Sequence, residues 1–526
     1  MNPRDQILDK LGPFENETYK DWSLPEHREP FLEALKKVRK LFPYEISLRI
    51  GADDVPTERK ITSTNPNDTG EVVGRTASAG KEEAEQAVQA AKSAFPSWRD
   101  TDPESRARYL FLAAAEAREK RNELAAIMVF EAGKNWIEAD ADVCEAIDFL
   151  EYYGREMIRL SAPRRMGNAP EEISHLMYQP RGVAAVFAPW NFPLAISVGM
   201  VSAAIVTGNT VIYKPSSNTV VTGSMVLRLF EPSGLPPGVL NYIPGPGDEI
   251  GDYLVTHPDV ALIAFTGSKE VGLRIIELAG RTPDGAEQVK AVVAEMGGKN
   301  AIIVDDDADP DEAVPHIIKS AFGYQGQKCS ACSRLIVHQN NHDEITQRLK
   351  LAAEGIEVGP AEDPKVMVGA VIDAQAKDKI HRYLEIGKQE GTVLFKRDVP
   401  QTRGHFVPIT IFTGIKPEHR LAQEEIFGPV LAVLKAKNFD EALEIANNTA
   451  YALTGAVFSR NPDHLARARR EFQVGNLYLN RGCTGALVER HPFGGFKMSG
   501  VGSKAGGPDY LHQFMLPKTV IENITG

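Results

Sequence analysis

After its first sixty residues the chain shows amphipathic segments in which apolar residues recur every three to four positions. That period is typical of helices that bury one face. It predicts four helices, over 82–95, 104–121, 122–131 and 138–160. The first sixty residues are charged, interrupted by proline and without strand alternation, so we expect an arm wrapped over a core, or else a partly disordered tail.

From residue 182 onward the pattern changes to short apolar runs rich in β-branched residues, separated by helix-like segments. Such alternation predicts parallel strands joined by right-handed crossovers, and therefore a doubly wound α/β sheet. Strands are expected over 183–188, 210–213, 239–243, 262–265 and 290–294, with helices beginning near residues 193, 219, 248 and 268.

A second series of the same kind begins at residue 300. Its pattern predicts strands over 300–304, 333–338 and 430–434, and helices over 309–323 and 342–355. Two consecutive series predict two α/β domains that meet near residue 296. We therefore divide the chain into an arm (1–60), a first α/β domain (61–295), a second α/β domain (296–503) and a C-terminal segment (504–526).

Composition narrows the class of protein. The 526 residues include 59 basic and 71 acidic side chains, a formal net charge of −12, which argues against binding to nucleic acid. The N-terminus lacks the apolar core of a signal peptide, and no apolar stretch reaches the length of a membrane span, so we expect no membrane association. Four cysteines are too few for a disulfide scaffold, which favours a reducing, cytoplasmic setting.

Cys329 is the candidate nucleophile. It follows a predicted helix, in a polar stretch broken by glycine, whereas structural cysteines usually lie among aliphatic residues. Its neighbours Lys328, Arg334, Gln325 and Gln327 favour the thiolate, the form that attacks electrophiles.

Two further residues have side chains suited to acyl chemistry. Asn191, held between two prolines at the end of the strand 183–188, offers an amide donor for an oxyanion; alternatively it caps the helix that follows. Glu295 ends the strand 290–294 just before two glycines. We expect partial burial there to raise its pKa into the range of a general base; alternatively it is a solvated turn residue.

Other candidates suit a nucleotide. Gly267 and Ser268, where a strand runs into a helix, offer backbone N–H groups and a hydroxyl to a phosphate, although the spacing is not that of G-x-G-x-x-G and a plain helix cap is the alternative. Lys214 ends a strand and can reach a ribose or phosphate, or be solvated. Glu425 and Phe427 can hold a ribose diol and pack a flat ring, or form an ordinary turn.

Taken in order, the motifs PWNFP, FTGS, EMGGK, GQKC, EEIFGP and PFGG resemble those of the aldehyde dehydrogenase superfamily, from about residue 65 to the C-terminus. The segments 329–334, 480–486 and 504–511, the long arm and the total length resemble one branch, the 1-pyrroline-5-carboxylate (L-glutamate γ-semialdehyde) dehydrogenases. The resemblance implies a Rossmann-type cofactor domain, an α/β catalytic domain and a small β extension for oligomerisation.

The resemblance also implies a mechanism. Cys329 attacks the aldehyde carbon, and the Asn191 amide and the Cys329 backbone N–H hold the oxyanion of the thiohemiacetal. Hydride passes to the nicotinamide, and Glu295 activates the water that hydrolyses the thioester. By the same carry-over the cofactor site includes Trp190, Lys214, Ser217, Gly247, Gly267, Ser268, Glu425 and Phe427.

Cofactor preference depends on Ser217. NAD-specific relatives often carry Glu three residues beyond the lysine, where its carboxylate holds the adenosine ribose and repels a 2′-phosphate. Since Ser217 lacks that charge, we predict that the chain uses NAD and also accepts NADP.

The residues expected to bind the substrate follow from the same branch. In it a loop grips the amino-acid end of the substrate through backbone N–H groups, and Gly485 and Ala486 match that loop. Glu145 is the weakest of these residues, since it also suits a solvated helix face. The full substrate set is Glu145, Phe192, Lys328, Ser330, Gly485, Ala486 and Phe493, and no metal site is expected.

Alternatives remain open at this point. Another small semialdehyde such as succinic semialdehyde is the nearest, a non-catalytic protein of the same fold is more distant, and Glu295 disfavours transfer to coenzyme A. Cys332 is expected to be a packing residue, or a partner of Cys329 in a disulfide or a thiol-disulfide oxidoreductase. We expect a homo-oligomer, at least a dimer, built through strands near 165–181 and the stretch 513–522, with proline dehydrogenase upstream as a separate protein.

Overall fold

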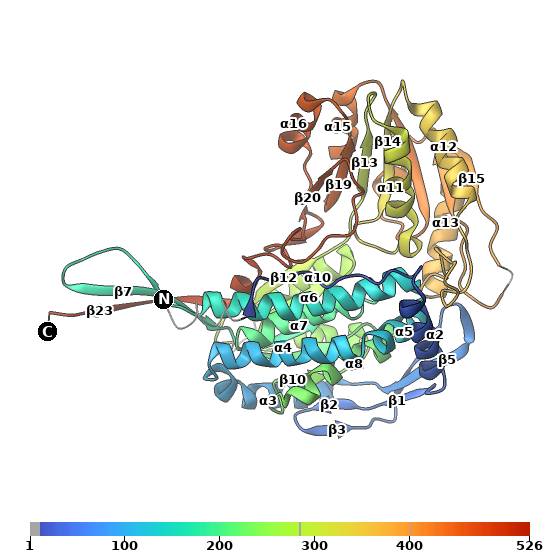
Figure 1. Cartoon of the computed structure of the whole chain (residues 1–526). Coiled ribbons are helices and arrows are strands. Elements are labelled where there is room, and N and C mark those ends of the chain that lie inside the picture. Colours follow the sequence, from blue (N-terminus) through green and yellow to red (C-terminus); the bar gives the residue numbers. More distant parts are fainter. Residues whose placement is uncertain (1–10, 283–285, 401, 526) are drawn as a thin grey trace.

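The computed structural model describes residues 11–282, 286–400 and 402–525. The first ten residues of the expected arm and residue 526 of the C-terminal segment lie outside these ranges. Two sheets form two layers of the molecule, one above the other, with a long ribbon projecting to one side (Figure 1).

The lower sheet has a parallel centre with helices on both faces. Its strands, in spatial order, are β22 (Gly500–Val501), β12 (Ala291–Glu295), β11 (Val260–Thr266), β8 (Val183–Phe187), β9 (Thr210–Lys214), β10 (Leu240–Tyr242), β2 (Leu48–Ile50) and β3 (Asp53–Val55). Its helices are α2 (Pro25–Arg39), α3 (Lys81–Arg99), α4 (Pro103–Glu119), α5 (Arg121–Glu131), α6 (Trp136–Leu160), α7 (Ala195–Val206), α8 (Val220–Phe230), α9 (Asp252–Thr256) and α10 (Lys269–Ala279).

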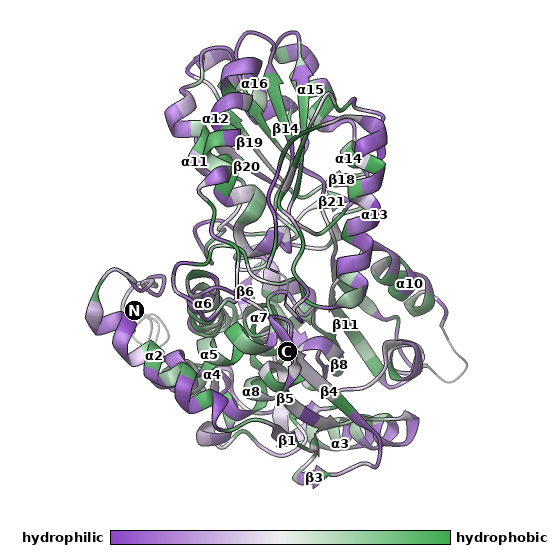
Figure 2. Ribbon diagram, turned by 90° about the vertical axis from the view of Figure 1, so that its right-hand side faces the viewer, coloured by the Kyte–Doolittle hydropathy of each residue, from purple (hydrophilic) through white to green (hydrophobic). Residues whose placement is uncertain are grey.

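Both faces of this sheet are apolar because helices cover both. Along β8, for example, Ala184 and Val186 belong to one core cluster, whereas Val183, Ala185 and Phe187 belong to the cluster on the other face. The continuous apolar runs of the sequence therefore reflect strands that are buried on both sides, as in doubly wound sheets (Figure 2). The prediction of an α/β fold of this kind is confirmed.

The upper sheet is built in the same way. Its strands, in order, are β15 (Thr392–Lys396), β16 (Thr410–Thr413), β17 (Val430–Ala436), β14 (Cys332–His338), β13 (Asn300–Val304), β19 (Thr454–Phe458) and β20 (Asn476–Leu479). Only the pair β15–β16 is antiparallel. The helices around it are α11 (Pro310–Phe322), α12 (His342–Glu354), α13 (Ala374–Glu390), α14 (Arg420–Gln423), α15 (Phe439–Asn447) and α16 (Pro462–Glu471).

The segment expected to be an arm or a disordered tail also contains strands. Residues 44–55 hold β1 (Tyr44–Ile46), β2 and β3; the last two extend the lower sheet, and β1 joins a small sheet with β4 (Lys60–Asn65) and β5 (Asp68–Ala77). Each of the three strands has only three residues, too few for a visible alternation. The reading as a partly disordered tail is therefore wrong over 44–55, and strands lie where none were expected.

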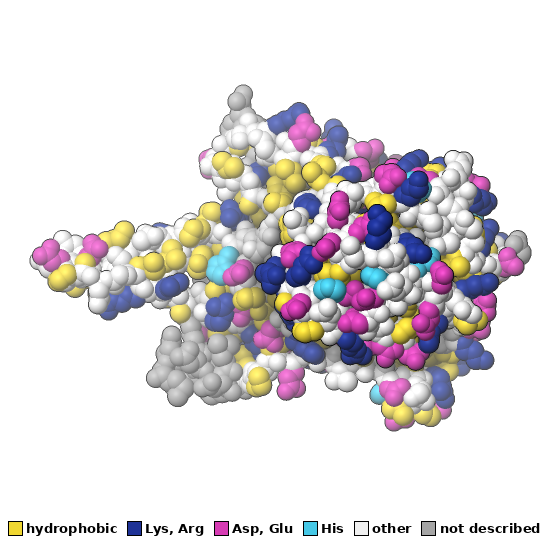
Figure 3. All heavy atoms as spheres, turned by 90° about the horizontal axis from the view of Figure 1, so that it is seen from above, with side chains coloured by type: hydrophobic (Ala, Val, Ile, Leu, Met, Phe, Trp, Pro, Cys, Tyr) yellow, Lys and Arg dark blue, Asp and Glu magenta, His cyan; other side chains and the backbone are white. Residues whose placement is uncertain are grey.

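The projecting ribbon pairs two distant segments of the chain. The strand β7 (Glu172–Pro180) runs antiparallel to β23 (Met515–Asn523) over nine paired residues, with β6 (Arg164–Arg165) beside it. Apolar side chains lie along the ribbon (Figure 3), and among them Val520 and Ile521 are 40% and 61% exposed. A further short pair joins β18 (Tyr451–Ala452) and β21 (Phe496–Lys497).

Candidate active site

The loop that carries Cys329 is fixed by unusual backbone geometry. It leaves α11 through a short helical turn in which Tyr324 and Gln325 have φ of 49° and 56°, a region that non-glycine residues rarely adopt. Buried hydrogen bonds hold it: the Gln325 amide donates to the carbonyls of Gly133 (2.9 Å) and Ala370 (2.8 Å). The nucleophile loop is therefore held in place on both sides of the cleft between the sheets.

The surroundings of Cys329 do not favour the thiolate, and that expectation was wrong. Burial, followed by the charges of Glu425, Glu295 and Glu145, raises the pKa of Cys329 to about 12. The neighbouring cation of Lys328 is paired at 2.7 Å with Glu138.

The other expected cation, Arg334, is also engaged. Its buried guanidinium donates to the carbonyls of Lys299, Ile445 and Ala446, at 3.0, 2.9 and 2.9 Å. It therefore fastens the strand after the nucleophile loop to its neighbours instead of facing the thiol.

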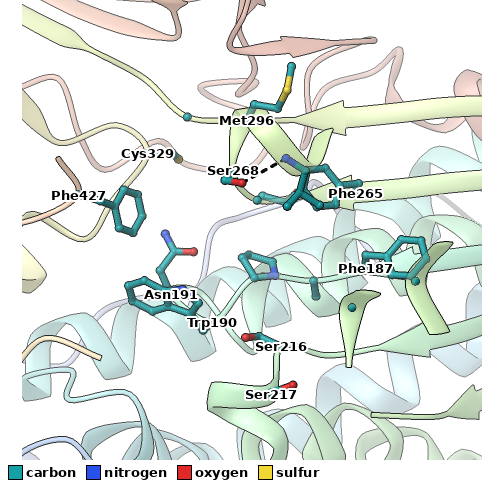
Figure 4. Close-up of a pocket in the computed structure, with 18 of the residues that line it drawn as sticks. Phe187, Trp190, Asn191, Ser216, Ser217, Phe265, Ser268, Met296, Cys329 and Phe427 are labelled. Carbon is teal, nitrogen blue, oxygen red and sulfur yellow. Dashed lines mark hydrogen bonds between the residues drawn. The ribbon is translucent and has the colours of Figure 1, made fainter. Parts of the chain in front are cut away.

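Asn191 lies opposite this loop and does not cap the helix that follows. That helix, α7, begins at Ala195 without a side-chain cap, whereas the Asn191 amide donates to the Gln327 carbonyl at 3.1 Å. Gln327 in turn accepts from the Ile372 N–H at 2.9 Å. This chain of hydrogen bonds fixes the Asn191 amide beside Cys329, and both residues line the same pocket (Figure 4).

Glu295 ends β12 with its carboxylate largely enclosed. Its Oε2 atom is buried and has no hydrogen-bond partner among the described residues. Burial raises the pKa of Glu295 to about 8, against the opposing effects of the Gly495 N–H and of Lys504. The predicted upward shift is confirmed. A Cβ on Gly494 would lie 2.9 Å from Glu295 Oε1, so this glycine makes room for the carboxylate.

A pocket of about 860 Å³ lies at the carboxyl ends of β8, β9 and β11, where ligands bind in open α/β sheets. All eight residues predicted for the cofactor line it, together with Asn191 and Cys329. Its walls are Trp190, Lys214, Ser217, Gly247, Gly267, Ser268, Glu425 and Phe427.

The geometry of these walls suits a dinucleotide. Ser268 caps α10, since its side chain accepts a hydrogen bond from the Val271 N–H at 3.3 Å. It also lines the pocket, so a helix cap and a position in the pocket are compatible. The helix N-terminus also offers partial positive charge to a phosphate. Trp190 and Phe427 meet edge to face at 5.5 Å on the Cys329 side of the pocket (Figure 4).

Two charged side chains in the pocket are tuned by their surroundings. Burial lowers the pKa of Lys214 to about 8, and its Nζ donates to the Pro215 carbonyl at 3.3 Å. Glu425 Oε1 accepts from the Gly298 N–H at 2.9 Å, which fixes the carboxylate at the pocket wall. Both therefore present polar atoms that a ribose or phosphate can use.

Sequence reasoning missed several residues of this pocket. Lys379 and Arg382 lie on α13, and Arg274 lies on α10, so three cations line its wall in addition to Lys214. The (i, i+3) spacing of Lys379 and Arg382 was a usable signal for one helix face, but no helix was predicted over 374–390.

The seven residues predicted for the substrate are not among those that line this pocket. Phe192 packs on Tyr324, with ring centres 6.4 Å apart, and Lys134 lies 3.9 Å above its ring. Burial, and then the charge of Asp142, raises the pKa of Glu145 to about 8.

Apart from Lys328, the other residues predicted to bind the substrate are Ser330, Phe493, Gly485 and Ala486. Ser330 is buried and accepts at its carbonyl from Thr454 Oγ1 at 3.3 Å. Phe493 exchanges two backbone hydrogen bonds with Ala505. Gly485 is exposed with φ of 77°, and Ala486 beside it is half-buried.

A fully buried ion pair was also missed. Lys134 Nζ lies 3.2 Å from Asp142 Oδ2, and both side chains are completely enclosed. Asp142 lies four residues after Glu138 and three before Glu145, so α6 turns all three carboxylates to one face. This spacing of carboxylates along the helix was the sequence signal from which the buried pair could have been predicted.

Cys332 opens β14 and is buried, with its Sγ donating to the Arg334 carbonyl at 3.3 Å. All four cysteines are free thiols in the structure. The position before a strand, rather than at the start of a helix, supports packing over a redox pair.

Comparisons with known proteins agree with this architecture. The model of the aldehyde dehydrogenase family matches residues 54–520. A 1-pyrroline-5-carboxylate dehydrogenase of Geobacillus thermodenitrificans is 51% identical over 512 residues, 97% of this chain and 99% of that protein. The 1-pyrroline-5-carboxylate dehydrogenase 2 of Bacillus subtilis is 50% identical over 510 residues, with the same coverage.

Solved structures give the same result. A 1-pyrroline-5-carboxylate dehydrogenase from Thermus with bound NAD superimposes with a TM-score of 0.96 at 48% identity, covering 98% of this chain and 99% of that one. Proline utilization A from Bdellovibrio bacteriovorus gives the same TM-score and identity. That match covers 97% of this chain but only 53% of the Bdellovibrio protein. The chain belongs to the aldehyde dehydrogenase family.

Proposed function

We propose that this chain oxidises L-glutamate γ-semialdehyde, which forms when 1-pyrroline-5-carboxylate opens in water, to L-glutamate with NAD. The observation that carries the proposal is that Cys329 and Asn191 line one pocket with all eight expected cofactor residues. Relatives about 50% identical over their full length, named for this substrate, support the choice of aldehyde.

In the proposed reaction the Cys329 sulfur bonds to the aldehyde carbon. Burial and nearby carboxylates keep the thiol protonated, since its pKa is about 12, so a base must take the proton as the sulfur attacks. Glu295, whose pKa of about 8 lets it ionise increasingly as the pH becomes mildly alkaline, is the available base.

The thiohemiacetal oxyanion then accepts hydrogen bonds from the Asn191 amide and the Cys329 N–H. NAD, when bound, supplies the hydride acceptor, and loss of hydride leaves a thioester on Cys329. After returning its first proton to solvent, Glu295 takes a proton from water, and the water oxygen attacks the thioester carbon. The C–S bond then breaks, glutamate is released, and the leaving thiolate of Cys329 takes the proton back from Glu295.

The other end of the substrate is an amino-acid head. We assign its carboxylate to the backbone N–H groups of Gly485 and Ala486, in a loop whose φ of 77° at Gly485 suits glycine. Phe192 and Phe493 flank the aliphatic chain, while Ser330, Lys328 and Glu145 complete the polar end. Because Lys328 is paired with Glu138, its role is to hold the loop that carries Cys329 against helix α6.

The domain roles and the assembly are part of the same proposal. We assign cofactor binding to residues 61–295 and catalysis to 296–503, and oligomerisation to the ribbon β7–β23, whose exposed Val520 and Ile521 suit a subunit contact, at least a dimer. A cytoplasmic location agrees with four free thiols. No helix in the described ranges is long and apolar enough to cross a membrane.

The preceding step is assigned to a separate proline dehydrogenase. The 99% coverage of the curated relatives supports this, whereas the Bdellovibrio protein is about twice as long.

The test is the appearance of reduced nicotinamide with purified protein, NAD and either 1-pyrroline-5-carboxylate or succinic semialdehyde. We expect a strong preference for 1-pyrroline-5-carboxylate. A preference for succinic semialdehyde would contradict the assignment of Gly485 and Ala486 to the substrate carboxylate. Inactivity with both aldehydes would contradict the proposed dehydrogenase activity.

A further inference from the structure

An N-terminal segment, residues 14–20, lies along helix α6 and under the loops of the upper layer. In Figure 1 it is the dark blue stretch that runs alongside α6. The Lys20 N–H donates to Asp140 at 3.0 Å and the Glu17 N–H to Asp148 at 2.7 Å, while Phe14 packs on Tyr152 at 5.4 Å. The segment is therefore bound over more than two turns of α6.

Asn16 joins this helix to a second part of the site. Its Nδ2 donates to Asp148 Oδ2 at 2.9 Å and to the Val488 carbonyl at 3.0 Å. Asp148 lies three residues after Glu145 on α6, and Val488 lies two residues after Ala486. One amide thus uses both of its hydrogens to connect the two elements that carry the expected substrate residues.

The loop that contains Gly485 and Ala486 is fastened on its other side by the C-terminal segment. The Glu489 N–H donates to the Gly506 carbonyl at 2.8 Å, and the packing at Gly506 is close, since a Cβ there would lie 3.2 Å from the Val488 Cα. The loop is therefore held between the C-terminal segment and Asn16, and Asn16 is its link to α6.

Tyr19 lies three residues further along the same segment, and its hydroxyl is close enough to Glu145 for that charge to affect its pKa. It is 51% exposed, yet burial of its hydroxyl, and then the charge of Glu145, raises its pKa. The segment thus borders the polar end of the site at two points, Asn16 and Tyr19.

We propose that residues 16–19 form the outer wall of the place where the amino-acid head of the substrate binds, with Asn16 as a positioning residue that sets the Gly485–Ala486 loop at its working distance from α6. This inference rests on the proposed function. It predicts an effect on binding of the amino-acid head and none on the aldehyde chemistry, because Asn16 contacts neither Cys329 nor Glu295.

The test compares the wild type with Asn16→Ala on two substrates, 1-pyrroline-5-carboxylate and propanal, an aldehyde without an amino-acid head. We expect the KM for 1-pyrroline-5-carboxylate to rise about tenfold, the scale of a lost hydrogen bond near a charged group, with kcat little changed. The KM for NAD and kcat/KM for propanal should stay at their wild-type values. Glu15→Ala is the matched control, since Glu15 is exposed on the same segment and has no interaction within the described residues.

An unchanged KM for 1-pyrroline-5-carboxylate, or equal losses on both aldehydes, would overturn the inference. Should Asn16→Ala fail to fold, Asn16→Asp keeps the size of the side chain without the amide donor, and the same split between substrates is expected. A wild type active on propanal but inactive on 1-pyrroline-5-carboxylate would overturn the proposed function, a result that the variants are not needed to recognise.

Discussion

Lys328 Nζ lies 2.7 Å from Glu138 Oε1, so the cation next to the nucleophile is already neutralised within the fold. Both side chains are about nine-tenths buried. Burial alone would raise the pKa of Glu138, but the charges of Lys328 and Lys134 outweigh it and lower the pKa. The pair ties the nucleophile loop to helix α6, and its contribution is to the position of the loop.

Glu138→Gln tests that contribution. The substitution leaves a buried ammonium without its counter-charge, and removing one partner of a buried pair costs about 3 kcal/mol. We expect a loss of that size in the free energy of unfolding, measured by urea denaturation. Glu156→Gln breaks the pair with Arg159 on the same helix. Since that arginine side chain is 48% exposed and can be solvated, this loss should cost under about 1 kcal/mol. Equal losses for the two variants would contradict a special role for the buried pair.

The pH dependence of deacylation should report on Glu295 and Lys504. Glu295 acts as a base only when ionised, so with a pKa of about 8 the rate should rise with pH through that value. Lys504 favours the ionised form, and Lys504→Met should therefore move this limb to higher pH, while Lys504→Arg should keep it. Single-turnover kinetics across pH measures the shift. If the pH at which the rate rises were the same in Lys504→Met as in the wild type, Lys504 would have no influence on the pKa of Glu295.

Glu295→Gln should separate the two halves of the reaction. Gln cannot accept a proton from water, so hydrolysis of the thioester should fall by about a hundredfold or more. Rapid mixing should then show whether one equivalent of reduced nicotinamide still forms. A burst followed by a stall would restrict Glu295 to hydrolysis, whereas loss of the burst would support its proposed second role, as the base for Cys329. Cys329→Ala, which has no nucleophile, should give neither phase.

The fold was largely predictable because its strands are buried on both faces. Runs such as 183–187 and 301–304 are apolar throughout, which restricts them to the centre of a covered sheet. Part of the pocket lining was also predictable, since Lys214, Gly267 and Ser268 lie where strands end and the carboxyl ends of parallel strands meet at one edge. Others of the expected cofactor residues, such as Trp190 and Gly247, came from the resemblance to the family. The strands in residues 44–55 were not, because three-residue strands carry no period and depend on partners such as β10.

The charge state around Cys329 could not be read from its neighbours in the chain. Lys328 is cancelled by Glu138, 190 residues away, and Glu425 acts on the thiol from 96 positions further along. The left-handed turn at Tyr324 and Gln325 is similarly set by remote carbonyl groups. Local sequence thus pointed to Cys329 as the candidate nucleophile, but the pKa of its thiol is a property of the assembled site.

Ser217→Glu should narrow the choice of cofactor. Ser217 lines the pocket as a neutral side chain, and a carboxylate there would face the 2′-phosphate of NADP. Because juxtaposed like charges are unfavourable, we expect kcat/KM for NADP to fall by at least about tenfold while NAD use is kept. Steady-state kinetics with both cofactors measures the ratio. If the wild type showed no measurable activity with NADP, the prediction that Ser217 allows NADP use would be wrong.

Asn191→Ala tests the oxyanion site. The amide is held by its hydrogen bond to the Gln327 carbonyl, so it is oriented before the substrate arrives and costs no reorganisation when charge develops on the oxygen. Removing one such donor typically lowers kcat by about a hundredfold. The affinity for NAD, measured by fluorescence titration, should change little, because the loss falls on the transition state. A variant that weakened NAD binding as much as turnover would make Asn191 a structural support of the pocket and leave the oxyanion to the Cys329 N–H alone.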